Sequence, residues 1–183
     1  MSQVDEKLNM NRHLFEEAKT LGFLVADPNG SPYMIPNTSF DAAMVDLTNN
    51  EARKWLKEVM HNMIKTGVKG WMADFGESLP LDATLSSNED PKEVHNRYPE
   101  MWAKLNREVV EESGDAELVF FMRAAYMKSP RWVSLFWEGD QMVSWQRHDG
   151  IKSAVVGLLS GGISGFAFNH SDIGIPCIHP VLA

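Results

Sequence analysis

Residues Gly70–Glu77 read Gly-Trp-Met-Ala-Asp-Phe-Gly-Glu, and this stretch decides the fold that we expect. An apolar strand over 68–74 ends on the carboxylate of Asp74, and the segment 78–80, Ser-Leu-Pro, then turns the chain away. Ligands of open α/β sheets and barrels bind at the carboxyl ends of the strands. Asp74 is therefore a candidate ligand-binding residue, although a helix cap or a loop acid would fit the same eight residues.

The segments around this strand alternate between strand-like and helix-like patterns. Ala42–Val45 reads as a strand that ends at Asp46. The next helix starts with the capping-box spacing of Thr48 and Glu51, repeats apolar residues at steps of three and four, and closes at Gly67. The other expected elements are helices over 12–21, about 91–112 and about 148–160, and apolar strands over 118–122, 133–137 and 165–168.

Apolar strands that alternate with helices are typical of an α/β fold with a parallel sheet built from βα units. We count about five such strands and no internal repeat. Residues 175–183 show no periodicity and are expected to form a flexible tail after a single domain.

The composition excludes several classes of partner. The chain has 183 residues, a net charge of −8 and one cysteine, Cys177, which leaves no intrachain disulfide and no cysteine-based zinc site. Nucleic-acid binding needs clustered Lys and Arg, a bilayer span needs about 18 apolar residues, and the sequence has neither. We expect no nucleic acid, membrane, metal or other cofactor as a partner. The N-terminus is acidic and unlike a signal peptide, so we expect a cytoplasmic location; the oligomeric state is left open.

Each apolar strand ends on a charged residue. These strand-terminal residues are Asp46, Asp74, Arg123, Asp140 and Asp172. Because the carboxyl ends of parallel strands meet at one edge, they predict a single negative crevice. Trp71, Trp137 and Trp145 offer flat apolar faces there, which suits a neutral sugar. Asp46 also fits a simple cap of the following helix and is left out of the candidate site.

Two carboxylates that face each other across a sugar are the minimum needed to cleave a glycosidic bond, one ionised and one protonated. Their surroundings have to separate these two roles. Asp74, beside Arg123, is expected to stay ionised. Asp140 follows Phe136 and Trp137 and is expected to be desolvated, which favours its protonated form.

At these residues the chain resembles glycoside hydrolase family 31, the retaining α-glycosidases built on a (β/α)8 barrel, over roughly 20–174. Gly70–Glu77 is similar to the family's nucleophile strand, and Trp137–Gln141 to its Trp-x-Gly-Asp signature. Arg123 stands where the family carries a pocket arginine, and His170–Gly174 is similar to its Asp-Ile-Gly motif. The forms of these motifs most resemble the α-glucosidase and sulfoquinovosidase branch.

The resemblance implies retaining hydrolysis of a small-molecule α-glycoside, with Asp74 as nucleophile and Asp140 as general acid/base. The motifs and the aromatic faces together give the candidate substrate-binding residues: Trp71, Glu77, Arg123, Trp137, His170 and Asp172. The sugar C6 group is not readable, because the residues with which that branch grips a sulfonate lie upstream of anything in this chain.

Two segments depart from the family pattern. Ala124–Pro130 replaces a Gly-Ser-Gln-type segment, and Ile175–Pro180 replaces a second glycine and a further strand. A complete barrel takes about 250 residues. We therefore expect residues 1–174 to form a partial (β/α)8 barrel, the middle part of a catalytic domain. The alternative is a truncated, inactive glycosidase fragment or a sugar-binding or regulatory product.

Overall fold

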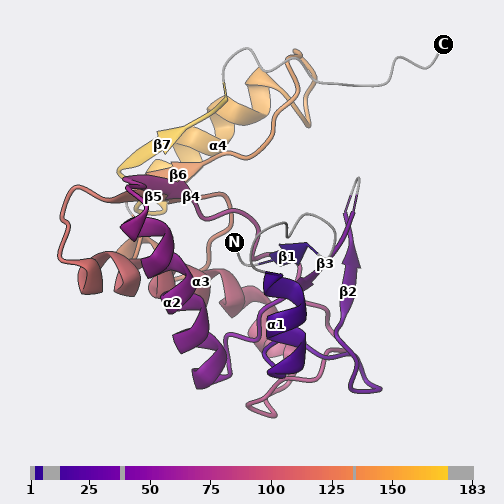
Figure 1. Ribbon diagram of the computed structural model, residues 1–183. Coiled ribbons are helices and arrows are strands. Elements are labelled where there is room, and N and C mark those ends of the chain that lie inside the picture. The colour runs from indigo at the N-terminus through magenta and orange to yellow at the C-terminus, as the bar shows by residue number, and fades with distance from the viewer. Residues whose placement is uncertain (1–2, 6–12, 38–39, 134, 173–183) are drawn as a thin grey trace.

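The computed structural model describes residues 3–5, 13–37, 40–133 and 135–172, which form two sheets and the helices packed on them (Figure 1). The expected tail over 175–183, with Cys177, lies outside the described residues, as do Ile173 and Gly174 of the Asp-Ile-Gly motif. In chain order the elements are β1 (Gln3–Asp5), α1 (Leu14–Thr20), β2 (Met34–Pro36), β3 (Asp41–Met44), α2 (Asn50–Lys65), β4 (Gly70–Met72), α3 (Pro91–Ser113), β5 (Val119–Met122), the 3-10 helix η1 (Ser129–Arg131), β6 (Leu135–Trp137), α4 (Ile151–Ile163) and β7 (Phe168–His170).

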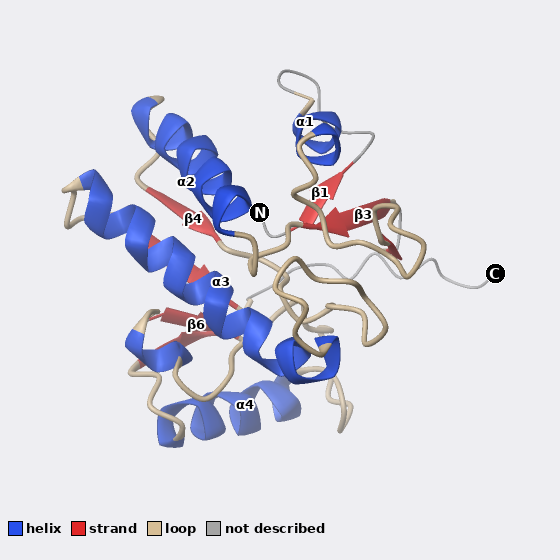
Figure 2. Cartoon of the chain, turned by 90° about the horizontal axis from the view of Figure 1, so that it is seen from below, coloured by secondary structure: helices blue, strands red, loops and turns tan. Residues whose placement is uncertain are grey.

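The larger sheet has the order β4-β5-β6-β7, and all its strand pairs are parallel. Helices α2, α3 and α4 lie around it, so the expected α/β class is confirmed (Figure 2). Within the described residues the parallel strands number four, where about five were expected. The strand over Ala42–Val45 accounts for the difference, because β3 pairs antiparallel with β1 and β2 in a separate sheet. Only 37–40 separate β2 from β3, and so short a connection joins antiparallel neighbours.

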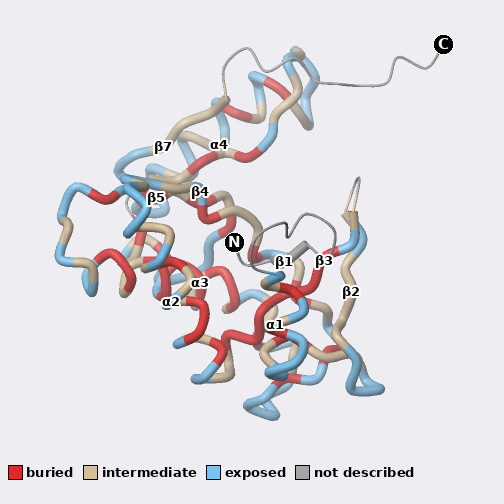
Figure 3. Tube along the Cα trace, viewed as in Figure 1, coloured by how far each residue is buried: buried red, intermediate tan, exposed pale blue. Residues whose placement is uncertain are grey.

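Helix α3 holds the two sheets together. Its Tyr98 and Trp102 are fully buried, and each donates a hydrogen bond to the first backbone carbonyl after a strand. Tyr98 Oη–H reaches Val45 O at 2.7 Å, just after β3, and Trp102 Nε1–H reaches Ala73 O at 3.2 Å, just after β4. Figure 3 shows the buried residues gathered where α2 and α3 meet the rest of the chain, whereas α4 and β7 are mostly exposed or half-buried.

The start of α2 differs from the capping box that the sequence suggests. Asn49, not Thr48, is the N-cap, and its Oδ1 accepts from the backbone N–H groups of Glu51 and Ala52. Thr48 is engaged elsewhere, because its hydroxyl donates to Asp46 Oδ1 at 2.6 Å. Asp46 is only 3% exposed, and its Oδ2 accepts from Ser86 N–H at 2.7 Å. It therefore joins the loop after β3 to the 82–90 loop rather than capping the helix.

Replacing Asn49 by Ala should lower the free energy of unfolding by about 1 kcal/mol, because two backbone donors lose their acceptor. Asn50→Ala, an exposed asparagine one residue later, is the matched control and should change stability by less than about 0.5 kcal/mol. Urea unfolding followed by circular dichroism measures both. Equal losses in the two variants would refute Asn49 as the cap.

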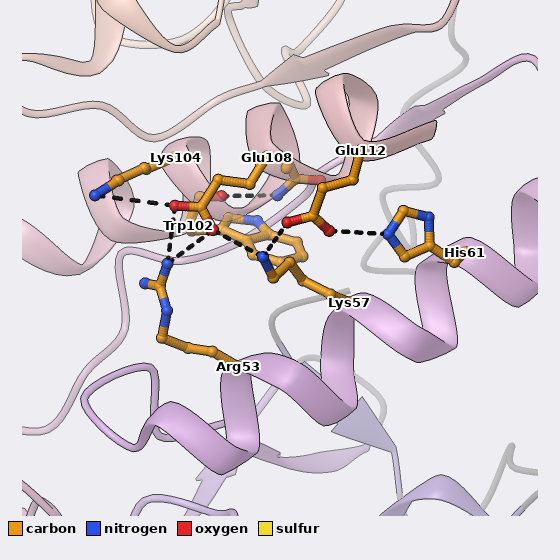
Figure 4. Close-up of polar contacts among 8 residues, drawn as sticks. Arg53, Lys57, His61, Trp102, Lys104, Glu108 and Glu112 are labelled. Carbon is orange, nitrogen blue, oxygen red and sulfur yellow. Dashed lines mark hydrogen bonds and ion pairs between the residues drawn. The ribbon is translucent and has the colours of Figure 1, made fainter. Parts of the chain in front are cut away.

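A ladder of charges joins α2 to α3 (Figure 4). Arg53 and Lys57 of α2 both contact Glu108 of α3, at 3.0 and 3.2 Å. Lys57 and His61 both contact Glu112, one turn further along α3. Burial by itself would lower the pKa of the Lys57 ammonium, but its hydrogen bonds to Glu112 and Glu108 outweigh burial and the pKa is raised. The hydrogen bond from Lys57, with a smaller contribution from His61, lowers the pKa of Glu112 below 4.5.

A carboxyl group whose pKa is lowered by folding stabilises the fold above its unfolded pKa, and that contribution is lost as the pH falls through its folded pKa. Glu112→Gln should therefore lower the free energy of unfolding at pH 7, by a few tenths to about 1 kcal/mol because the side chain is half exposed. The difference from the unmodified chain should shrink below the ordinary pKa of 4.5. Urea melts from pH 7 to pH 3 test this, with Glu111→Gln, a neighbouring exposed acid, as control. A gap that stays constant over this range would contradict the lowered pKa.

Helix α4 begins at Ile151 rather than near 148, and its apolar positions are not a buried stripe. Five apolar residues recur here at helical spacing: Ile151, Ala154, Val155, Leu158 and Leu159. Only Ala154 among them is buried, and Leu159 is 66% exposed. The helix instead approaches the sheet through two glycines. A Cβ atom at Gly157 would clash with the Glu138 carboxylate, and one at Gly161 with the Asn169 amide.

Across the described ranges, no helix combines the length and apolar character that a bilayer span requires.

Candidate active site

Asp74 lies where β4 ends and the backbone turns sharply. Phe75 and Gly76, the next two residues, have positive φ angles of 62° and 105°. The Phe75 N–H donates to Asp74 Oδ1 at 2.8 Å, which fixes the carboxylate over the turn. A left-handed conformation costs a non-glycine residue about 1–2 kcal/mol, and such strain concentrates at functional sites. Trp102 of α3 fixes the start of this turn, because its Nε1–H donates a hydrogen bond to the Ala73 carbonyl.

Arg123, the first residue after β5, gathers three carboxylates. Its Nε lies 3.2 Å from Asp74 Oδ1, and its Nη2 donates to Glu77 Oε1 at 2.8 Å. Its Nη1 lies 3.9 Å from Asp140 Oδ2, which makes a looser ion pair. The guanidinium carbon also sits 4.5 Å from the centre of the Phe75 ring, a cation–π distance. The structure thus brings four of the predicted site residues together, with three carboxylates around the Arg123 cation.

The sequence predicts that Asp140 is desolvated, and the structure shows that it is not. Its side chain is 81% exposed, because Gly139 has a φ of 80° and carries the chain away from buried Trp137. The aromatic residues before Asp140 pack into the sheet instead of over its carboxyl group: Trp137 is only 2% exposed. The desolvating cover that we expected for Asp140 is therefore absent from the described residues.

A second group of predicted residues forms beside β6 and β7. Trp137 Nε1–H donates to Asp172 Oδ1 at 2.9 Å, and the Trp137 and His170 rings are stacked with centroids 6.4 Å apart. Phe121 contacts both rings edge-on. Asp172 Oδ2 is buried and has no hydrogen-bond partner among the described residues.

Two of the three aromatic faces predicted for a sugar are not available to one. Trp137 is buried, and Trp71 points to the other side of the sheet, where its Nε1–H donates to Asn106 Oδ1 of α3 at 2.7 Å. Trp71 also stacks on Phe120. Trp145 is 75% exposed and lines a groove of about 680 Å³ with His170 and Asp172 among its other walls.

Glu138 lies inside the Trp137–Gln141 motif but is not among the predicted site residues. It lines a cavity of about 300 Å³ next to Glu77 and Arg123, which also has His95 of α3 in its wall. Its Oε1 is buried without a hydrogen-bond partner, and burial raises the pKa of this carboxyl group. The sequence signal for a role of Glu138 is its place as an acid between Trp137 and Gly139 at the end of an apolar strand. In the described part of the chain, no three His, Cys, Asp or Glu side chains are grouped as a metal site.

The parallel sheet and the acidic cluster together define the class of protein. It is a partial (β/α)8 barrel with an acidic site at the carboxyl ends of its strands. The model of the family described as "Glycosyl hydrolases family 31 TIM-barrel domain" matches residues 1–175. The chain belongs to glycoside hydrolase family 31, as its motifs predicted.

Individual relatives agree with this assignment. The sulfoquinovosidase of Escherichia coli (strain K12) is 42% identical over 95% of this chain and 26% of its own length. The sulfoquinovosidase of Agrobacterium fabrum is 40% identical over 95% of this chain and 27% of its own length. The solved structure of a family 31 sulfoquinovosidase from E. rectale, in complex with an aza-sugar inhibitor, superposes with a TM-score of 0.87 at 40% identity, over 94% of this chain and 26% of that one. The chain thus spans about a quarter of the length of these relatives.

The turn after Asp74 should tolerate no side chain at Gly76. A Cβ atom there would meet Trp102 Cδ1 at 3.3 Å, and its φ of 105° is unfavourable for alanine. Gly76→Ala should therefore lower the free energy of unfolding by about 2–4 kcal/mol, from strain and crowding together. Gly30→Ala is the control, since its φ is 85° but nothing lies within 4 Å of the added Cβ, and it should cost only about 1 kcal/mol. Urea unfolding that showed equal losses would mean that Trp102 does not restrict this turn.

Proposed function

We propose that this chain carries the reaction centre of a retaining α-glycosidase, with Asp74 as the nucleophile and Asp140 as the general acid/base. The observation that carries the proposal is the convergence of Asp74, Glu77 and Asp140 on the guanidinium of Arg123. All four follow the carboxyl ends of neighbouring parallel strands, where barrels bind substrates. Retaining hydrolysis requires two carboxyl groups at one site.

In the first step the Asp74 carboxylate attacks the anomeric carbon, and the bond to the aglycone oxygen breaks as Asp140 gives that oxygen its proton. The product is a glycosyl ester of Asp74 and a free alcohol. In the second step Asp140 takes a proton from water, whose oxygen displaces Asp74 and restores both carboxyl groups. The exposure of Asp140, 81%, leaves it open to the incoming water.

The other site residues would position the sugar. Arg123 and Glu77 hold each other beside Asp74 by hydrogen bonds of 2.8 and 3.1 Å. Asp172, which accepts a hydrogen bond from the Trp137 indole, lines with His170 the groove of about 680 Å³ in which part of the sugar would lie. Trp71 and Trp137 support this arrangement from inside the fold and do not present a face to the sugar.

Sulfoquinovosides are the first substrates to test, because two relatives at least 40% identical are sulfoquinovosidases. α-Glucosides come second. The 4-nitrophenyl derivatives of both sugars give a direct absorbance assay, and isothermal titration calorimetry measures binding separately from turnover.

Asp74→Ala should abolish release of nitrophenol, and Asp140→Ala should slow it by roughly 10²–10⁴-fold, the usual contribution of a general acid/base. Azide, a small nucleophile that needs no general base, should rescue the two variants differently. With Asp140→Ala it should give an α-glycosyl azide, because two displacements retain configuration. With Asp74→Ala it should give the β-azide, because one displacement inverts it.

Asp41→Ala, an exposed aspartate of β3 outside the site, should leave turnover unchanged. Full activity in Asp74→Ala, or the same azide product from both variants, would refute the assigned roles. Sugar binding without any turnover in the unmodified chain would favour a sugar-binding product over an enzyme, and neither binding nor turnover would overturn the proposal.

A further inference from the structure

Phe75 holds a backbone conformation that its residue type avoids. Among the described residues, three that are not glycine have positive φ angles: His13, Phe75 and Asn88. Histidine and asparagine adopt the left-handed region comparatively often, whereas for a bulky apolar residue it is a genuine outlier. Asparagine or glycine would form the same turn at a lower conformational cost. The turn alone therefore does not explain a phenylalanine at this position.

The backbone of Phe75 holds one member of the acidic cluster. Its N–H donates to Asp74 Oδ1 at 2.8 Å. This contact needs only a peptide N–H, so any residue except proline could make it. The turn that aims this N–H is itself fixed, because Trp102 binds the Ala73 carbonyl and lies against Gly76. The hydrogen bond accounts for the turn but not for the ring.

The ring of Phe75 meets the cation of the cluster. The guanidinium carbon of Arg123 lies over this ring, 4.5 Å from its centre. An arginine donates hydrogen bonds from the edges of its planar group and stacks through its faces. Here the edges serve the acids, with Nε 3.2 Å from Asp74 Oδ1 and Nη2 2.8 Å from Glu77 Oε1. The ring therefore attracts the cation without competing for the N–H groups that the carboxylates use.

The charges around Arg123 show what a contact on the guanidinium face adds. Three carboxylates attract this one cation, at 2.8, 3.2 and 3.9 Å. An arginine side chain has much rotamer freedom, and acids alone would let it exchange among these partners. A ring carried by a strained, well-supported turn restricts that freedom. The Phe75 N–H and the Arg123 Nε also contact the same oxygen, Asp74 Oδ1, so together they orient this carboxylate.

We propose that Phe75 is a positioning residue of the reaction centre, whose ring holds the Arg123 guanidinium between Asp74 and Glu77. The consequence for catalysis rests on the proposed function, whereas the contact itself does not. Every residue involved lies at the carboxyl ends of two paired strands, β4 and β5.

NMR of the arginine Nε–H groups in the intact, nitrogen-15-labelled chain tests the contact without any substrate. Arg123→Lys assigns the Arg123 signal by its loss, and Arg53, which pairs with Glu108, is the internal reference. Because the cation lies over the ring, ring current should place the Arg123 Nε–H proton upfield of its position in Phe75→Leu. The same variant should speed the exchange of this proton with water. Phe75→Tyr keeps a ring and should preserve both properties.

Turnover of the nitrophenyl glycosides tests the catalytic consequence. Phe75→Leu should lower kcat/KM roughly 2–30-fold, the equivalent of one cation–π contact, and Phe75→Tyr should restore it. Phe75→Gly adopts a φ of 62° without strain, so it separates the ring from the turn and should be as slow as Phe75→Leu. Phe23→Leu is the matched control, because Phe23 is a half-buried phenylalanine beside Trp55, and it should change neither readout.

The two measurements fail separately. An Arg123 signal with the same position and exchange rate in the unmodified chain and in Phe75→Leu would overturn the proposal, as would full turnover in Phe75→Leu and Phe75→Gly. If the unmodified chain turns over no glycoside, the proposed function fails, and the Arg123 signal still decides whether the ring holds the cation. Circular dichroism melts show that each variant folds, and Phe75→Gly replaces Phe75→Leu in the comparison if the leucine variant does not.

Discussion

The contact between the Trp102 indole and the end of β4 is the constraint on which the rest of the structure depends. Trp102 is fully buried, donates to the Ala73 carbonyl, and lies only 3.3 Å from the position that a Cβ atom at Gly76 would take. It thereby fixes both the end of the strand and the left-handed turn that aims Asp74 at Arg123. Asn106 extends the contact, because it accepts from Trp71 of β4 and donates to the Trp102 carbonyl one turn back. The acidic cluster is therefore positioned by α3, the longest helix, and not by the loops around it.

Much of this arrangement was predictable from local patterns. Helices α2 and α3 follow from their spacing and their glycine stops, and the strand ends at Asp74, Arg123 and Asp140 follow from charges that interrupt apolar runs. Parallel strands bring their carboxyl ends to one edge, so the convergence of these three residues required only the correct fold class. The family resemblance added the chemistry, and the matching family model confirms that membership.

What the sequence did not give depends on contacts between distant residues. Thr48 and Asn49 are both good N-caps, and the choice is made by Asp46, which takes the Thr48 hydroxyl while it binds Ser86. An apolar strand does not reveal which side faces the helices, so Trp71 was placed with the sugar although it packs on α3. The exposure of Asp140 and the burial of Glu138 are set by how the loop after β6 leaves the sheet, which no local pattern encodes.

The glycines of α4 bear on the order in which the molecule assembles. A glycine inside a helix costs about 0.5–1 kcal/mol relative to alanine. Helix α4 has three glycines, and two of them, Gly157 and Gly161, are required by close contact with Glu138 and Asn169. With few buried side chains of its own, this helix gains little from forming alone. It becomes favourable only when the ends of β6 and β7 already provide the surface on which its glycines fit. We therefore expect the β6–α4–β7 unit to be completed from its strands inward, with α4 the last helix to form and the first to open.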